Sequence, residues 1–168
     1  MPFTPFHFGP GLLVKGCMPR GFWLTSFMLS NVLIDLEVLY YIHRGESPLH
    51  RHLHTYVGGV AMGVVAALVM LSLALVARAF IPAFSRRLGI STPTPIRLML
   101  LQSLAAGLVG GVSHIVLDSF MHRDMHPFWP FARGNSLIGL VGIAELHIAL
   151  ALMGFLGIVI WLFLRDTE

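Results

Sequence analysis

The residues with the clearest chemical potential lie between Ser113 and Phe131, where His114, Asp118 and His122 follow one another at four-residue spacing. Positions i and i+4 lie on one face of an α-helix. Imidazole and carboxylate groups gathered on one face form a ligand set for a borderline divalent metal such as zinc. The same pattern also fits a polar stripe at the point where a helix leaves a membrane. The other histidines and the acidic residues decide between these two interpretations.

The composition is that of an integral membrane protein. Of the 168 residues, 56% are hydrophobic and only 11% are charged, whereas a soluble domain carries roughly 25% charged residues. The length predicts a single domain over residues 1–168. The net charge of +3 comes from scattered arginines, and the absence of a basic block argues against nucleic acid as a partner.

The apolar segments predict an all-α, polytopic membrane protein with about four transmembrane helices and a short N-terminal half-membrane or interfacial helix. A crossing needs roughly 20 residues, and four segments are long enough, at about 21–42, 56–81, 96–120 and 136–164. Segment 1–20 is interrupted too often by proline and glycine to cross. Close helix contacts are expected at two small-xxx-small pairs, which are Gly59 with Gly63 and Gly107 with Gly111.

Four spans place the histidines and acidic residues at one end of the bundle. Ser47 and Pro48 predict the N-cap and first residue of the second helix, so that His50 and His54 form an i, i+4 pair. His7 joins the cluster if the N-terminal segment starts on the same side of the membrane and dips back. The candidate metal ligands are His7, Asp35, His50, His54, His114, Asp118, His122, His126 and Glu145.

The acidic residues inside the spans favour metal binding over structural polarity. A carboxylate in hydrocarbon is costly unless it is paired, and the sequence offers no arginine at the depth of Asp35 and Asp118. Bound cations would offset that cost. Glu37 lies about 200° from Asp35 around an ideal helix, so we interpret it as a helix-end ion pair with Arg44, seven residues later.

These motifs resemble the YdjM-like family of membrane-bound metal-dependent hydrolases, which shares its motif order with the zinc-dependent phospholipase C and P1 nuclease group. The resemblance covers roughly residues 5 to 131, and Ser-His-x-x-x-Asp is its most specific part. The matching segments are His7, Ile34-Asp35-Leu36-Glu37, His50-Arg51, His54-Thr55, Ser113-His114-Ile115-Val116-Leu117-Asp118 and Pro127-Phe128-Trp129-Pro130.

The resemblance implies two or three bound Zn²⁺ ions and hydrolysis of a phosphoester. It leaves open whether His50 or His54, and whether His122 or His126, is a ligand. The later His-x-x-x-Glu of the family is absent, because Glu145 and His147 are two residues apart. Asp35 is the candidate for holding or deprotonating the attacking water, and Arg51 and Arg123 are candidates for gripping phosphate oxygens. The arginines suit lipid headgroup contact equally well.

A position at the membrane rim suggests a lipid or a lipid-linked phosphate as the substrate, and an inner or plasma membrane as the location. Seven of the eleven basic residues lie opposite the cluster, which predicts cytoplasmic termini and an outward-facing site. The alternative function is a metal or proton transporter or sensor that uses the cluster as a binding site. The almost purely apolar second span argues against a path through the membrane.

Overall fold

The computed structural model describes residues 5–81 and 94–164, and every regular element in this part of the chain is helical. Four of the helices are long and apolar enough to cross a membrane. This confirms the all-α, polytopic fold with a short N-terminal helix. The described elements are η1 (Pro5–Phe8), α1 (Gly9–Cys17), α2 (Leu24–Arg44), α3 (Tyr56–Phe80), α5 (Ile96–Met121) and α6 (Ile143–Leu164).

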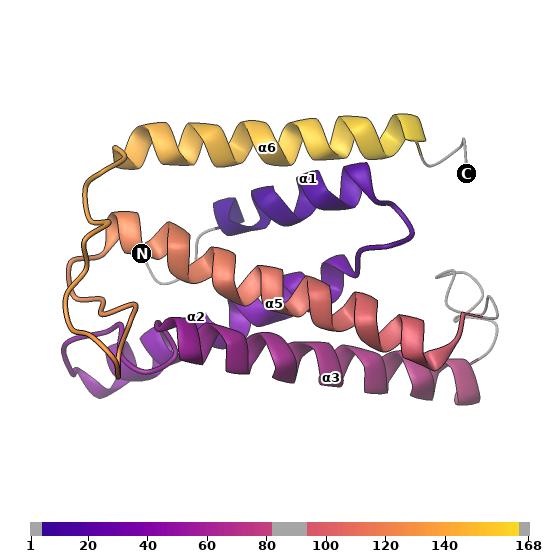
Figure 1. Ribbon diagram of the computed structural model, residues 1–168, viewed down its shortest axis with the longest axis horizontal. Helices are drawn as coiled ribbons and strands as arrows, with labels where there is room; N and C mark the ends of the chain where they lie inside the picture. The colour runs from indigo at the N-terminus through magenta and orange to yellow at the C-terminus, as the bar shows by residue number, and fades with distance from the viewer. Residues whose placement is uncertain (1–4, 82–93, 165–168) are drawn as a thin grey trace.

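Figure 1 shows the long helices running roughly side by side, with α3 against α5, α2 against both, and α1 between α5 and α6. The loops 45–55 and 122–142 lie at the same end of the bundle. With its 9 residues, α1 is about 14 Å long at 1.5 Å per residue, roughly half of a bilayer core. It leads away from the loop end, whereas α6 ends at the opposite end (Figure 1). The described part of the chain therefore starts near the loop end and finishes at the opposite end of the bundle.

Small residues allow the closest helix contacts, as the two glycine pairs predict. A Cβ atom on Gly111 would lie 2.0 Å from the Gly59 carbonyl oxygen, and one on Gly107 would lie 2.2 Å from the Gly63 oxygen. Only glycine therefore permits this approach of α3 to α5. A second interface of this kind, between Gly16 on α1 and Gly157 on α6, was not predicted.

Two helices begin later than the sequence predicts. The helix α3 starts at Tyr56 and not near Pro48, with the Thr55 side chain accepting a hydrogen bond from the Gly58 N–H as the N-cap. The reason is that acidic side chains bind the N–H groups of residues 49–54, as described below, so no helical turn forms there. The interpretation of Ser47 and Pro48 as a helix start is therefore wrong.

The helix α6 starts at Ile143, seven residues after the expected start. Gly134 and Gly139 adopt positive φ angles of 100° and 73°, which helices do not contain. The Asn135 side chain donates hydrogen bonds to the carbonyls of Ser119 and His122 and so caps the end of α5. Segment 134–142 consequently folds over the end of α5 instead of extending α6.

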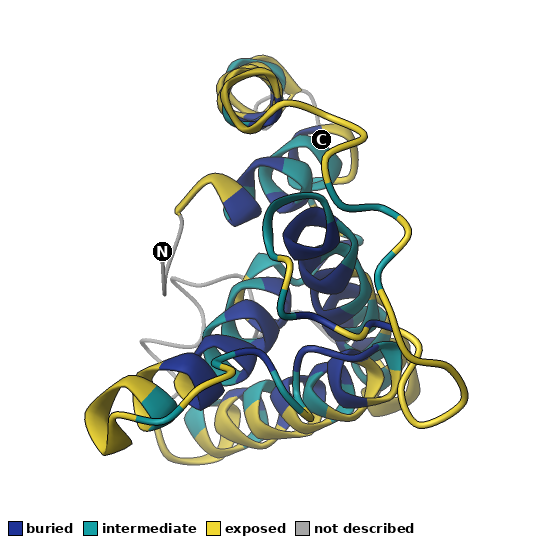
Figure 2. Ribbon diagram, turned by 90° about the vertical axis from the view of Figure 1, so that its left-hand side faces the viewer, coloured by how far each residue is buried: buried dark blue, intermediate teal, exposed yellow. Residues whose placement is uncertain are grey.

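The burial pattern is inverted relative to a soluble bundle, as a lipid-facing protein requires. Figure 2 shows the outer faces of α3 and α6 as exposed, and these faces carry large apolar side chains such as Leu73 and Phe155. The buried faces carry small and polar residues, including Ser26 and Ser103, whose hydroxyls lie 2.8 Å apart. The most polar part of the interior is the loop end, where the histidines gather.

Three of the seven basic residues counted opposite the cluster lie outside the described residues, namely Arg86, Arg87 and Arg165.

Candidate metal centre

Four buried side chains from three segments meet at the loop end of the bundle. Their metal-binding atoms all lie within 4.8 Å of one another. The helix α5 supplies two of them at i, i+4 spacing, α2 supplies one, and the loop 45–55 supplies the fourth. We call this set the first group, and it consists of Asp35, His54, His114 and Asp118.

A second group shares Asp118 with the first and adds His50 and His122. The Oδ2 atom of Asp118 lies 3.2 Å from His114 Nε2 and 3.6 Å from His54 Nε2. Its Oδ1 atom lies 3.8 Å from His122 Nε2. The two oxygens of one carboxylate therefore face two separate sets of histidines, as in a centre that holds two metal ions.

His7 joins this centre from the N-terminal segment. Its Nε2 atom lies 2.9 Å from Asp118 Oδ1, and its ring stacks on His114 with 4.6 Å between the centroids. The short helices η1 and α1 bring it there, because they start at the loop end. The sequence-based condition for including His7 is therefore met.

Hydrogen bonds at Nδ1 fix the tautomer of three of these histidines. His54 Nδ1 lies 2.9 Å from Glu37 Oε2, and His50 Nδ1 lies 2.9 Å from the Asp124 carboxylate. An ionised carboxylate only accepts hydrogen bonds, so both Nδ1 atoms carry the hydrogen. His114 Nδ1 lies 3.1 Å from Asn31 Oδ1. In its neutral form each of these rings therefore keeps a lone pair on Nε2.

The orientation of the Asn31 amide supports this assignment for His114. The Asn31 Nδ2 atom donates to the Phe27 carbonyl at 2.8 Å, so Oδ1 is the atom turned to His114. Histidines that ligate metals almost always donate their second ring nitrogen to an oxygen in this way. In their neutral form these three histidines would present Nε2 to a metal ion.

The Nε2 atoms of His54 and His114 provide the test of whether a cation fits. Both side chains are fully buried, and within the described residues neither Nε2 atom makes a hydrogen bond of proper geometry. Each instead faces carboxylate oxygens of Asp35 and Asp118 at 3.2 to 3.9 Å. Lone pairs opposite carboxylates are repulsive and costly to bury. A divalent cation between them removes that cost, so the residues fit a metal.

The two loop histidines of the second group, His50 and His122, are neutral near pH 7. Burial lowers the pKa of His50, against the opposing effect of Asp124, and it lowers the pKa of His122 to about 4. Neutral imidazole is the form that binds metals. Burial alone would raise the pKa of Asp124, but its hydrogen bonds to the His50 ring and to the backbone hold the pKa below the usual value.

Besides His7, which contacts Asp118, four predicted site residues lie outside both groups. His126 is exposed, and its Nδ1 atom accepts the Gly134 N–H. Glu145 is exposed in the first turn of α6. Arg51 stacks over the Tyr41 ring at 3.7 Å and pairs with Glu46 at 3.2 Å.

Arg123, the fourth of these residues, is exposed beside His122. His122 is the most accessible member of the two groups, with 19% of its side chain exposed. The centre is therefore reached from the His122 side, where Arg123 also lies. Of the two predicted phosphate-binding arginines, Arg123 is the one without a partner assigned in the described part of the chain.

Three important residues were missed by sequence reasoning, namely Asn31, Glu37 and Asp124. The ion pair predicted between Glu37 and Arg44 is wrong, because Glu37 binds the loop and His54, while Arg44 pairs with Glu46 at 3.5 Å. The available signal was the polar character of Asn31 and Glu37 within an apolar span. Asp124 gave no signal, since a polar residue is ordinary in a loop.

The fold and the site define an α-helical membrane protein with a buried histidine–aspartate centre that could hold metal ions. No known family model, curated protein or solved structure matches the chain. The function is therefore argued from the centre itself and from the motif resemblance.

Proposed function

We propose that this protein is a membrane-embedded, metal-dependent hydrolase that cleaves a phosphoester in a lipid or lipid-linked substrate. The observation that supports it most is the arrangement around Asp118, whose two oxygens face two sets of histidines. The buried Nε2 lone pairs of His54 and His114 point to a cation in the first group. A mixture of imidazole and carboxylate ligands suits zinc.

The chemistry follows from the division of roles among the ligands. The two groups would hold the divalent ions, which when bound would supply a water with a lowered pKa and polarise phosphoryl oxygens. We assign Asp35 to orient that water and to accept its proton. Asp35 suits this role because its nearest basic neighbours, His114 and His54, lie 3.5 and 3.9 Å away. Asp118, with His7 at 2.9 Å, is more firmly held and joins the two groups.

The surroundings of the centre favour a substrate from the membrane. Phe128, Trp129 and Phe131 are exposed in the loop that follows His122, and aromatic side chains of this kind gather at membrane–water interfaces. Arg123, which is exposed at the same rim, is our candidate for binding phosphate oxygens. These two features are our reasons for assigning a lipid or a lipid-linked phosphate as the substrate.

The transporter alternative requires polar groups that continue to the far end of the bundle. Below Asn31, the buried polar residues on α2 and α5 are Ser26, Ser30 and Ser103. Ser30 and Ser103 donate to the carbonyls of Phe27 and Ala67, and Ser26 bonds to Ser103. These hydroxyls are all hydrogen-bonded within the helices and none of them titrates, which favours an enzyme over an ion path.

For the orientation in the membrane, we propose an outward-facing site and a cytoplasmic C-terminus. The reason is that four described basic residues lie at or beside the helix ends opposite the loop end, namely Lys15, Arg20, Arg78 and Arg97. A reporter fused to the C-terminus tests this assignment. Reporter activity outside the cytoplasm would reverse it.

The test of function combines metal content with hydrolysis. Purified protein in detergent is analysed for bound metals and is then assayed on a chromogenic phosphodiester and on phospholipid vesicles, with and without a chelator. We expect about two equivalents of metal and chelator-sensitive release of phosphorylated product. Asp118→Asn should abolish both properties, whereas Glu145→Gln should preserve them. Metal-loaded protein that accumulates the ion in vesicles without hydrolysis would identify a transporter, and metal-free protein would remove both functions.

A further inference from the structure

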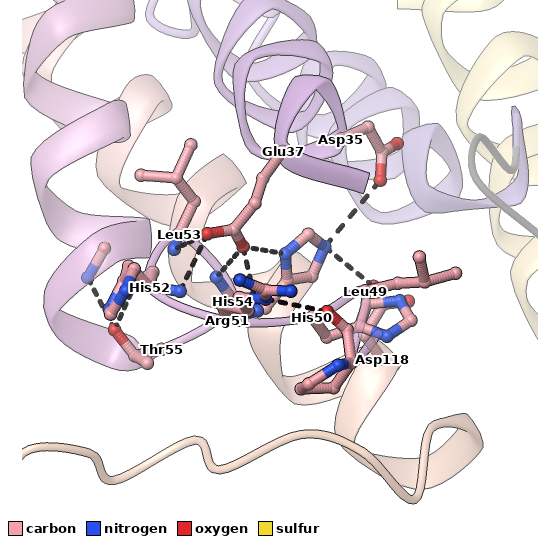
Figure 3. A network of polar contacts seen from close by, with 12 residues as sticks. Asp35, Glu37, Leu49, His50, Arg51, His52, Leu53, His54, Thr55 and Asp118 are labelled. Carbon is pink, nitrogen blue, oxygen red and sulfur yellow. Dashed lines mark hydrogen bonds and ion pairs between the residues drawn. The ribbon is translucent and has the colours of Figure 1, made fainter. Parts of the chain in front are cut away.

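The loop that carries His50 and His54 is held by two carboxylates that bind its backbone. The N–H groups of Leu49 and His50 donate to Asp124 Oδ2 at 3.0 and 3.3 Å. The next four N–H groups donate to the two oxygens of Glu37 at 2.7 to 3.3 Å (Figure 3). Six consecutive N–H groups therefore point to two anions. Concave runs of N–H groups of this kind form nests for negative charge.

Each carboxylate also binds the ring of one histidine in the same loop. Glu37 accepts the Nδ1–H of His54, and Asp124 accepts the Nδ1–H of His50, both at 2.9 Å. The backbone and the ring are thus fixed by the same anion. One consequence is that each histidine has a single tautomer and a single orientation before any metal arrives.

The burial of Glu37 shows that its role is not simple charge pairing. It is 8% exposed, and in the described part of the chain its only ion-pair partner is His54. Five N–H donors surround its two oxygens, which saturates the acceptor capacity of a carboxylate. A glutamine of the same shape replaces one oxygen by an NH₂ group, which would face at least two of these donors.

The two carboxylates serve different metal groups. Glu37 holds His54, which belongs to the first group, and Asp124 holds His50, which belongs to the second. Asp124 lies two residues after His122, so it also ties the loop 45–55 to the end of α5. The two groups share Asp118, but a different carboxylate holds the loop histidine of each group.

We propose that Glu37 and Asp124 are the positioning residues of the two metal groups, one for each, and that each sets the metal affinity of its own group. This inference rests on the proposed metal centre. It predicts that the two sites weaken independently, which a purely structural role for the loop would not produce.

The experiment titrates metal-free protein with Zn²⁺ against a competing chelating dye and resolves two equivalents. The variants are Glu37→Gln and Asp124→Asn. Each should weaken one equivalent by about 10- to 100-fold, the usual effect of losing a partner of a ligating histidine, and leave the other nearly unchanged. The matched control is Glu46→Gln, because Glu46 is a partly exposed carboxylate of the same loop whose ion-pair partners in the described part of the chain are arginines. It should bind both equivalents normally.

A second measurement separates this inference from the proposed function. Nitrogen NMR of histidines in the metal-free wild type, assigned with His54→Asn and His50→Asn, should show the Nδ1–H tautomer for both rings. A hydrogen on Nε2 of either neutral ring would overturn the proposal, even if the protein binds metal. If the wild type binds no metal, the proposed function is refuted. The NMR measurement of the tautomers then still decides whether the two carboxylates position the His50 and His54 rings.

The titration can also refute the proposal directly. If Glu37→Gln and Asp124→Asn weaken both equivalents to the same degree, or if Glu46→Gln does so too, the carboxylates support only the loop. Should Glu37→Gln fail to fold, Glu37→Asp keeps both acceptors on a shorter side chain. It should then weaken the first equivalent alone, and normal binding by that variant would overturn the proposal.

Discussion

Replacing Gly111 by alanine should damage the metal centre through the packing of two helices. Gly111 lies where α5 crosses α3, three residues before His114. A Cβ atom at this position would lie 2.0 Å from the Gly59 carbonyl oxygen, whereas ordinary contact begins at 3.4 Å. The added methyl therefore requires about 1.4 Å of extra separation, which is the difference between these two distances. The neighbour is backbone, so no side-chain rotation can provide it.

The expected effect of Gly111→Ala on the free energy of unfolding differs in size from its effect on metal affinity. Overpacking costs about 1–3 kcal/mol, and alanine recovers about 1 kcal/mol of that through its higher helix propensity. Metal–ligand distances, in contrast, tolerate only about ±0.2 Å. Moving α5 from α3 shifts His114 relative to His54, whose loop leads directly into α3. We therefore expect a small loss of stability and a large loss of affinity in the first group.

The assay measures thermal unfolding in detergent and zinc titration for Gly111→Ala and for Gly154→Ala. The second variant is the matched control, since a Cβ on Gly154 would lie 3.5 Å from its nearest neighbours, an ordinary contact. It should unfold at or above the wild-type temperature and bind metal normally. Wild-type affinity in Gly111→Ala would show that the helix contact does not set the geometry of the centre.

Three further outcomes are expected. Removal of the metal by a chelator should destabilise the protein by about 2.7 kcal/mol relative to free metal at 100 times its Kd, and unchanged thermal unfolding would show that no metal is bound to the folded state. Asn31→Leu should weaken metal binding by the first group about 10- to 100-fold, because His114 Nδ1 loses its acceptor. The control is Ser30→Ala, which removes a hydroxyl that donates to the Phe27 carbonyl and should leave metal affinity unchanged. His126→Ala should keep both metal equivalents, because the His126 ring is exposed and lies in neither group; the loss of one equivalent would assign it as a ligand.

The sequence was sufficient to predict the parts of this molecule that depend on periodicity. Hydrophobic runs predicted four candidate spans, and the four-residue spacing of His114 and Asp118 placed them on one face of a helix. The glycine pairs predicted close helix contacts, because close approach in lipid depends on residue size, and the structure shows that these contacts join α3 to α5. Even the gathering of Asp35 with His54 followed from counting alternating spans.

The parts that could not be predicted depend on backbone groups that leave no trace in the sequence. The donors bound by Glu37 are mostly main-chain N–H groups of residues 51–54, and any residue type supplies those. For the same reason the loop before Thr55 resembled a helix start. The late start of α6 depends on Asn135 capping α5, a contact between segments that spacing does not encode.

The helical positions of Asp35 and Glu37 explain why two acids so close in sequence are both buried. Their separation of about 200° around α2 prevents them from meeting at one point, but it lets them reach opposite sides of a single ring. Glu37 Oε2 lies 2.9 Å from His54 Nδ1, and Asp35 Oδ1 lies 3.9 Å from His54 Nε2. Because Glu37 keeps the hydrogen on Nδ1, Asp35 faces a lone pair.

Within the described residues every ion-pair partner of Asp35 and Asp118 is a histidine. Neutral imidazoles do not compensate two carboxylates in a low-dielectric interior, and protonation of His54 at Nε2 would place three charged groups together in the buried interior. A divalent cation compensates both carboxylates and uses the lone pairs that Glu37 and Asn31 have oriented. Metal binding is therefore the arrangement that makes the burial of these acids and the orientation of these rings consistent with each other.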